Sequence, residues 1–102
     1  MTEILNYLNH HYQNATLGST AEYFGYSTSH FSTLIKEGTG QTFLQIIRDI
    51  KLNQACRALR ETKLSNHAIC DLVGYESPEH FMRTFKKAYG ITPGEYRKKH
   101  KI

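Results

Sequence analysis

Two stretches of the sequence repeat one pattern about fifty residues apart: GYSTSHF at residues 25–31 and GYESPEHF at residues 74–81. Both begin with glycine and tyrosine, continue through a serine and end with histidine and phenylalanine; the second stretch is one residue longer. Glycine readily ends a helix in the left-handed conformation, and serine is a preferred capping residue at the start of the next helix. Each stretch therefore predicts a helix end, a tight turn and the start of a second helix.

The repetition continues on both sides of these stretches. With shifts of 50 and, upstream, 49 residues, the paired positions are Ser27/Ser77, His30/His80, Phe31/Phe81, Lys36/Lys86, Gly40/Gly90, Thr42/Thr92, Ala21/Cys70, Gly25/Gly74 and Tyr26/Tyr75. A short helix, a glycine-bearing turn and a capped second helix are the layout of a helix-turn-helix, whose second helix enters the DNA major groove. A duplicated helical hairpin can also serve only as a scaffold.

Helical periodicity runs through the whole chain, and no sustained strand-like alternation occurs, so we expect an all-α fold of seven helices. Pro78 follows the serine cap at 77, which is a strong signal for a helix start. The first expected helix runs from Ile4 to Tyr12, and the second runs from a cap at Ser19 or Thr20 through Phe24, with Glu22 as the capping-box partner of Ser19. The third runs from a cap at Ser27 to about Glu37 and is ended by GTG at 38–40, and the fourth extends over about 20 residues from a cap at Thr42. The fifth runs from a cap at Ser65 to Gly74, the sixth from a cap at Ser77 to about Tyr89, and the seventh from a cap at Thr92 to about Lys98.

The charge is unevenly distributed along a basic chain, which has 13 Lys and Arg, 9 Asp and Glu, and a pI near 9.1. Residues 1–47 hold one lysine and three glutamates, a net charge of −2, whereas residues 48–102 have a net charge of +6. A basic excess favours an anionic partner such as a nucleic acid. A solvated basic tail is the alternative interpretation of the cluster at residues 97–101.

Other classes of function find little support. Cys56 and Cys70 lie in apolar helical patterns, as expected for buried reduced thiols in a cytoplasmic protein. No apolar run approaches the ~20 residues of a membrane span. His67 and Cys70 share a helical face and His10 neighbours His11, but neither pair completes a zinc site. We therefore expect no enzymatic activity, metal, cofactor or membrane partner.

The stretch AICDLVGYESPEHFMRTFKKAYGITPGEYR at residues 68–97 resembles the signature of the AraC/XylS family of bacterial transcription regulators, in their DNA-binding domain. GYS and LIKEGTGQTF in the first unit, and LNQACRAL before the second, fit the same family, so the resemblance extends from about Ile4 to Arg97. Three positions depart from the family pattern: Cys70 replaces a usual alanine, Thr20 a common apolar residue, and Lys51 a usual arginine. Lys51 lacks the guanidinium fork, which would weaken a bidentate contact or a phosphate contact there.

The resemblance implies two homeodomain-like helix-turn-helix units, residues 1–41 and 63–102, joined by a linker helix over residues 42–62, which together form one functional DNA-binding domain. A helix of about 20 residues spans roughly 30 Å, and major-groove segments on one face of DNA recur about every 34 Å. We therefore expect two adjacent major grooves to be read. Double-stranded DNA and RNA polymerase are the expected partners. Effector or dimerisation domains of the family are expected in the full-length protein, of which this chain would be an excised domain; a natural stand-alone regulator is the alternative.

The outward positions of each second helix are the candidate DNA contacts. Phe31, Leu34 and Ile35 are expected in the core, as are Phe81 and Phe85. By resemblance, Ser29, Ser32 and Thr33 face bases in the first unit; Glu79, Met82 and Arg83 are the candidates in the second, and Arg83 is the strongest, as a bidentate donor to guanine. The expected phosphate contacts are Ser27, Lys36, Ser77, Lys86, Lys87, Thr92, Arg97 and Lys98.

Two alternatives remain open at the level of sequence. His30 and His80 are interpreted as partly buried packing residues with local hydrogen bonds, and a DNA backbone contact is the second interpretation. The chain as a whole could instead be a helical adaptor whose basic face meets an acidic partner or RNA polymerase. An adaptor should lack the steep salt dependence that phosphate neutralisation produces.

Overall fold

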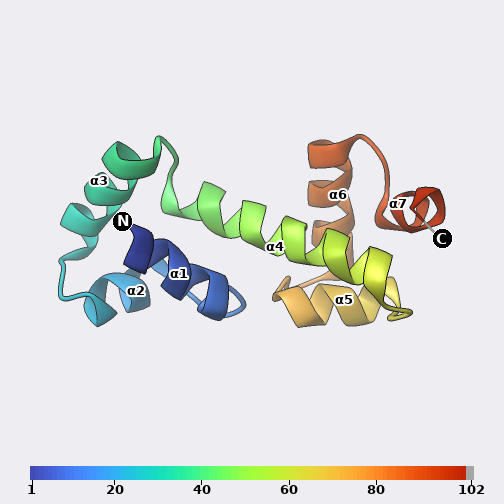
Figure 1. The fold of residues 1–102 in the computed structure, drawn as a ribbon, viewed down its shortest axis with the longest axis horizontal. Coiled ribbons are helices and arrows are strands. Elements are labelled where there is room, and N and C mark those ends of the chain that lie inside the picture. Colours follow the sequence, from blue (N-terminus) through green and yellow to red (C-terminus); the bar gives the residue numbers. More distant parts are fainter. Residues whose placement is uncertain (101–102) are drawn as a thin grey trace. The chain divides into compact units, whose positions relative to one another are not determined.

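The computed structural model describes residues 1–100, and every regular element in that range is an α-helix (Figure 1). This confirms the all-α fold of seven helices. Residues 101–102, the end of the expected second unit, lie outside the described part. The helices are α1 (Thr2–His11), α2 (Leu17–Tyr23), α3 (Thr28–Thr39), α4 (Phe43–Glu61), α5 (Asn66–Val73), α6 (Pro78–Tyr89) and α7 (Pro93–Lys99).

The chain packs as two compact units, and the boundary between them falls inside α4, between Ile50 and Lys51. The first unit contains α1 to α3 and the beginning of α4, and the second contains the rest of α4 and α5 to α7. Each unit buries its own apolar side chains. The most deeply buried are Leu8, Ala21, Phe31 and Ile35 in the first unit and Leu52, Ala55, Leu59, Ile69, Cys70, Val73, Phe81 and Phe85 in the second.

The two repeated turns have the same backbone geometry, as their sequences predict. Gly25 and Gly74 have φ angles of 78° and 87°, in the left-handed region that disfavours side chains. The amide of the following tyrosine donates to a carbonyl five residues earlier, from Tyr26 to Ala21 at 2.9 Å and from Tyr75 to Cys70 at 3.1 Å. This bond closes the end of α2 in the first unit and of α5 in the second.

The second helix of each helix-turn-helix, α3 in the first unit and α6 in the second, also begins and ends in the same way. The hydroxyls of Ser27 and Ser77 accept hydrogen bonds from the amides of His30 and His80, both at 3.2 Å. The phenylalanines that follow, at positions 31 and 81, have no exposed surface. Each helix therefore has a capped start and one face anchored in the core of its unit.

The predicted start of the second helix was wrong, because α2 begins at Leu17, after a cap at Thr16. The Thr16 hydroxyl accepts from the Ser19 amide at 3.0 Å, and the Ser19 hydroxyl accepts from the Thr16 amide at 3.1 Å. Ser19 thus plays the part that we expected of Glu22. Thr20 is fully buried, and its hydroxyl donates to the Thr16 carbonyl at 2.8 Å, so this departure from an apolar residue leaves no unsatisfied polar atom.

The end of the third helix also differs slightly from the prediction. Helix α3 continues through Gly38 to Thr39, and Gly40, with a φ of 76°, is its terminator. In the second unit Gly90 ends α6 with a φ of 79°, as predicted. A residue in the left-handed region breaks the helical path, and of the two glycines in the GTG sequence only Gly40 has a positive φ, so it decides where α3 ends.

The helices that begin after Gly40 and Gly90, α4 and α7, start with the same pair of reciprocal hydrogen bonds. The Thr42 hydroxyl accepts from the Gln45 amide at 3.2 Å while the Gln45 side chain accepts from the Thr42 amide at 2.8 Å. Thr92 and Glu95 make the same reciprocal pair at 3.1 and 3.0 Å. The predicted caps at these two threonines are confirmed, and the repeat extends to this third helix start.

Candidate nucleic-acid interface

Helix α6 has one buried face and one face that is open to solvent. Phe81 and Phe85 are fully buried, with their ring centroids 5.9 Å apart. The other side of the helix exposes Glu79, Met82 and Arg83, the three predicted base contacts of this unit. Because the phenylalanines fix the rotation of the helix about its axis, these three side chains are held together on the outer face.

Helix α3 repeats this arrangement with different chemistry. Phe31 and Ile35 are fully buried, and the predicted base contacts Ser29, Ser32 and Thr33 are exposed. The Thr33 hydroxyl donates to the Ser29 carbonyl at 3.1 Å, so it is held within the helix and presents its methyl group and an acceptor oxygen. The outer face of α3 is therefore small and hydroxyl-rich, whereas that of α6 has an arginine and a thioether.

Several of the predicted phosphate contacts have intramolecular partners. Ser27, Ser77 and Thr92 act as helix caps through their hydroxyl oxygens. The Lys36 ammonium donates to the Gly40 carbonyl at 3.3 Å, at the end of its own helix. A capping serine or threonine still has its hydroxyl proton to donate, so capping is compatible with a phosphate contact. Lys86, Lys87 and Lys98 are exposed at the ends of α6 and α7.

Arg97 is positioned by contacts that the sequence did not reveal. Its Nε donates to the Leu59 carbonyl at 3.2 Å and its Nη2 to the Thr62 carbonyl at 3.4 Å. These carbonyls lie at the carboxyl end of α4, where a helix has unsatisfied acceptors. Nearby, the Arg60 guanidinium donates to the Tyr96 hydroxyl at 2.6 Å. Two arginines thus connect α7 with the end of α4 within the second unit.

The two repeated histidines are exposed, which corrects the expectation that they are partly buried. Each packs its ring against the tyrosine of its own turn, with centroid distances of 5.2 Å for Tyr26 and His30 and 5.4 Å for Tyr75 and His80. The part of the prediction that concerned local packing is therefore confirmed. The histidine rings lie over the turn rather than in the core because the buried position is already taken by the next residue, phenylalanine.

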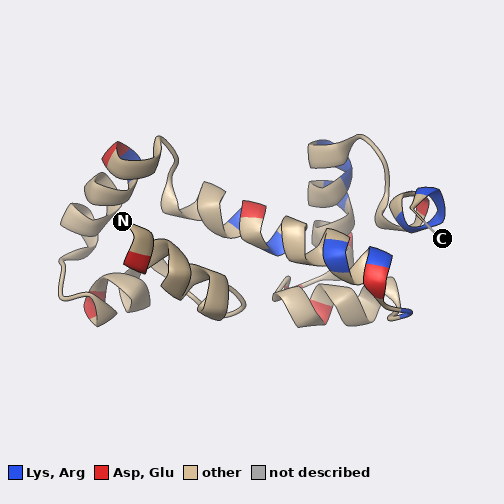
Figure 2. Cartoon of the chain, in the orientation of Figure 1, with Lys and Arg blue, Asp and Glu red and all other residues tan. Residues whose placement is uncertain are grey.

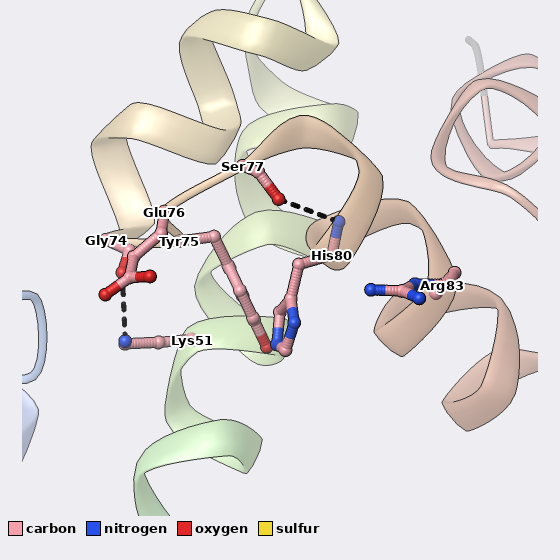
Figure 3. A pocket seen from close by; sticks show the side chains of 7 residues that line it. All are labelled: Lys51, Gly74, Tyr75, Glu76, Ser77, His80 and Arg83. Atoms are coloured by element: carbon pink, nitrogen blue, oxygen red, sulfur yellow. Dashed lines mark hydrogen bonds between the residues drawn. The ribbon is translucent and has the colours of Figure 1, made fainter.

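A pocket of about 360 Å³ lies beside the turn of the second unit (Figure 3). Lys51 enters it from α4, and its ammonium donates to the Gly74 carbonyl at 3.0 Å. The same ammonium lies 5.3 Å from the centroid of the Tyr75 ring, a cation–π distance. The residues that line this turn pocket are Lys51, Gly74, Tyr75, Glu76, Ser77, His80 and Arg83.

Burial affects two titratable groups at this turn. The pKa of Lys51 is lowered, mainly by desolvation of its ammonium, and the negative charge of Glu76 partly opposes that change. The pKa of the Cys70 thiol is raised, first by burial and then by the charges of Asp71 and Glu79. Cys56 and Cys70 are both buried and free, as predicted. A buried thiol of raised pKa is a packing group rather than a nucleophile.

Lys and Arg residues are concentrated in the second unit, in α6, α7 and the later turns of α4, as the colouring of Figure 2 shows. Residues 51–102 contain eleven of the thirteen Lys and Arg residues and five of the nine acids. Over residues 1–100, no group of three or more potential ligands gathers in the geometry of a metal site. Within the same residues, none of the helices combines the length and apolarity needed to cross a membrane.

The chain is similar in sequence and in structure to known helix-turn-helix proteins. A family model described as a helix-turn-helix domain matches residues 20–99. The xylose operon regulatory protein of Escherichia coli K12 is 36% identical over 89 residues, which are 87% of this chain and 23% of that protein. The C-terminal domain of AraT, a response regulator from Geobacillus stearothermophilus, has a TM-score of 0.93 at 32% identity and covers 99% of this chain and 85% of its own.

A third similarity is of fold alone. The DNA-binding domain of AdpA, solved in complex with a target DNA, has a TM-score of 0.91 at 22% identity, covering 97% of this chain and 90% of that one. The chain spans at most about a third of the length of the first curated relatives that it matches.

Proposed function

Because the chain belongs to the AraC-type helix-turn-helix family of DNA-binding transcription regulators, we propose that it reads double-stranded DNA with the second helix of each helix-turn-helix, α3 and α6, in the major groove. The observation that carries this proposal is the repeated geometry: in both units a capped helix turns one phenylalanine-anchored face inward and a polar face outward. A major groove admits an α-helix, and base edges are read from its outer side chains.

The two units should contribute differently to recognition. Arg83 can donate two parallel hydrogen bonds to guanine, a contact of about 1–3 kcal/mol in discrimination. The hydroxyls of Ser29 and Ser32 both donate and accept, and Thr33 presents a methyl group and an acceptor oxygen, so these residues discriminate less between bases. We infer that α6 supplies most of the sequence preference and, with Lys86, Lys87, Lys98 and the other phosphate contacts that its unit offers, most of the salt-dependent affinity.

The rest of the full regulator is inferred from the relatives rather than from this chain. The relatives are longer, and one is named for an operon. We infer that the full-length protein controls transcription in the cytoplasm, in contact with RNA polymerase, through a further domain that senses an effector or forms a dimer.

Selection of binding sites from random duplex DNA tests the proposal. Two recognition elements should emerge, and their separation should measure how the units are placed on DNA, about one helical turn if adjacent grooves are read. Arg83→Ala should remove the preference at one base pair and cost about 1–3 kcal/mol on the selected site only. Lys87→Ala is the matched control, since loss of a phosphate contact should weaken selected and random duplexes alike.

Two outcomes of these binding measurements would contradict the proposal. If Arg83→Ala binds the selected site with wild-type affinity and unchanged base preference, α6 does not read bases through this residue. If the wild-type chain binds duplex DNA weakly and without salt dependence, the helical adaptor remains the better interpretation.

A further inference from the structure

The turn pocket of the second unit has features that the reading of bases by α6 does not explain. It draws residues from α4, from the turn and from α6, and Figure 3 shows the rings of Tyr75 and His80 between the Lys51 and Arg83 side chains. One pocket thus presents two cationic side chains on either side of an aromatic pair.

Lys51 is partly buried without an ion-pair partner. Within residues 1–100 no carboxylate forms a salt bridge with its ammonium, and Glu76 acts on it only as a longer-range charge. The ammonium donates one hydrogen bond, to the Gly74 carbonyl, and an ammonium has three protons to donate. Desolvation lowers the pKa of Lys51, so the charged form of its ammonium is less stable here than in water. An anion bound beside the ammonium would stabilise that charged form again.

Ser77 offers a second donor to the same pocket. Its hydroxyl oxygen accepts from the His80 amide at 3.2 Å, and its own proton is available to another acceptor. An ammonium and a hydroxyl that line one pocket suit an anion with several acceptor oxygens, and a DNA phosphate is such a group.

We propose that the turn pocket binds one phosphodiester group of the DNA backbone, with Lys51 and Ser77 as its donors. The proposal rests on the DNA binding proposed above and adds to it a contact from the linker helix. A phosphate seated against the turn also sets the register of α6, so that Arg83, at the far side of the pocket, faces the base edges. Lys51 is then a phosphate ligand and also a positioning residue for Arg83.

The repeat shows why this contact belongs to the second unit. Glycine, tyrosine, serine and histidine recur in the first unit at positions 25, 26, 27 and 30, but Thr33 occupies the position of Arg83. Residues 1–50 contain only Lys36 and Arg48 as basic side chains of the Lys or Arg type. The first unit therefore has the turn without the pair of cations.

Glu76 is an acidic residue of the pocket, and its negative charge disfavours phosphate binding. Its carboxylate lines the same space and would repel a phosphate. It is exposed, so its replacement by glutamine should leave the fold intact. If a phosphate binds here, Glu76→Gln should raise the affinity for duplex DNA several-fold at low salt and less at high salt.

The test compares Lys51→Gln with Lys51→Arg on a duplex obtained by selection, across a series of KCl concentrations. Glutamine removes the charge but keeps an N–H donor, whereas arginine keeps the charge. We expect Lys51→Gln to reduce the slope of log K against log salt by about 0.9, the value for one lost phosphate contact, and Lys51→Arg to retain the slope. Circular dichroism and thermal unfolding check that each variant is folded.

A neutral methylphosphonate at single positions of the duplex identifies the phosphate itself. One such position should weaken binding of the wild type and have no further effect on Lys51→Gln. If a folded Lys51→Gln keeps both affinity and slope, the phosphate site is refuted while DNA binding stands. If Lys51→Gln fails to fold, Glu76→Gln decides the question, because unchanged affinity in that variant overturns the proposal. Absence of salt-dependent binding by the wild type would refute the proposed function instead.

Discussion

Replacing Arg97 by alanine should destabilise the second unit even where no DNA is present. The guanidinium donates to the carbonyls of Leu59 and Thr62, at 3.2 and 3.4 Å, and so satisfies acceptors that a helix end leaves open. It also places a positive charge at the carboxyl end of α4, where the helix dipole favours one. Alanine would remove both effects and the tether between α7 and α4.

The size of the loss follows from these contacts. A hydrogen bond from a charged donor contributes about 1.5–3 kcal/mol when well formed. Both bonds of Arg97 are long, and one of them is exposed, so their sum should be nearer to about 1–2 kcal/mol. For a domain of this size each kcal/mol shifts the melting temperature by roughly 4–8 °C. The expected decrease in Tm is therefore about 5–15 °C.

Thermal and urea unfolding, followed by circular dichroism, measure the effect. Lys98→Ala is the matched control, because Lys98 is an exposed neighbour on the same helix and should change stability by less than about 0.5 kcal/mol. Arg97→Lys should recover only part of the loss, since an ammonium cannot present the two donors of the guanidinium.

DNA binding then distinguishes the structural role from the predicted phosphate contact. One outcome is that Arg97→Ala has the same melting temperature as the wild type and Lys98→Ala but lowers the slope of log K against log salt by about 0.9. In that case Arg97 is a phosphate ligand and the stability argument is refuted. If it lowers Tm and leaves the salt slope of the folded protein unchanged, the carbonyl contacts explain the residue fully.

Two further predictions concern the fold. Gly25→Ala should lower the free energy of unfolding in urea by about 1–2 kcal/mol, because the φ of 78° at this position disfavours a side chain even though open space surrounds it. Gly18→Ala, in helix α2 with equally open space, should instead stabilise the protein by up to about 1 kcal/mol. Equal effects of the two substitutions would contradict this reasoning. Hydrogen bonds from Thr92, first its amide and then its hydroxyl, lower the pKa of Glu95 below 4.5, so the stability from this capping box should be present above pH 4.5 and lost as pH falls through the lowered pKa. Glu95→Gln should flatten that part of the pH–stability profile, and an unchanged profile would show that the capping box contributes nothing to it.

Most of the fold was predictable because its signals are local. The caps at Ser27, Ser77 and Thr92 and the left-handed glycines act within four residues along the chain, so a short stretch of sequence contains both partners. The start of α2 was missed for a related reason. Several hydroxyl residues stand together there, and the sequence does not show which of them will pair; the structure selects Thr16 and Ser19.

The sequence by itself determined two capped helix-turn-helix units, their outward residues and their unequal charge, because helical periodicity and capping are properties of neighbouring residues. Only the tertiary structure decided which basic residues have internal roles. Lys51 meets Gly74 across 23 residues, and Arg97 meets Leu59 across 38. Such contacts depend on how helices pack, which no local pattern encodes, and they distinguish a lysine beside a pocket and an arginine on a helix end from basic side chains that merely face solvent.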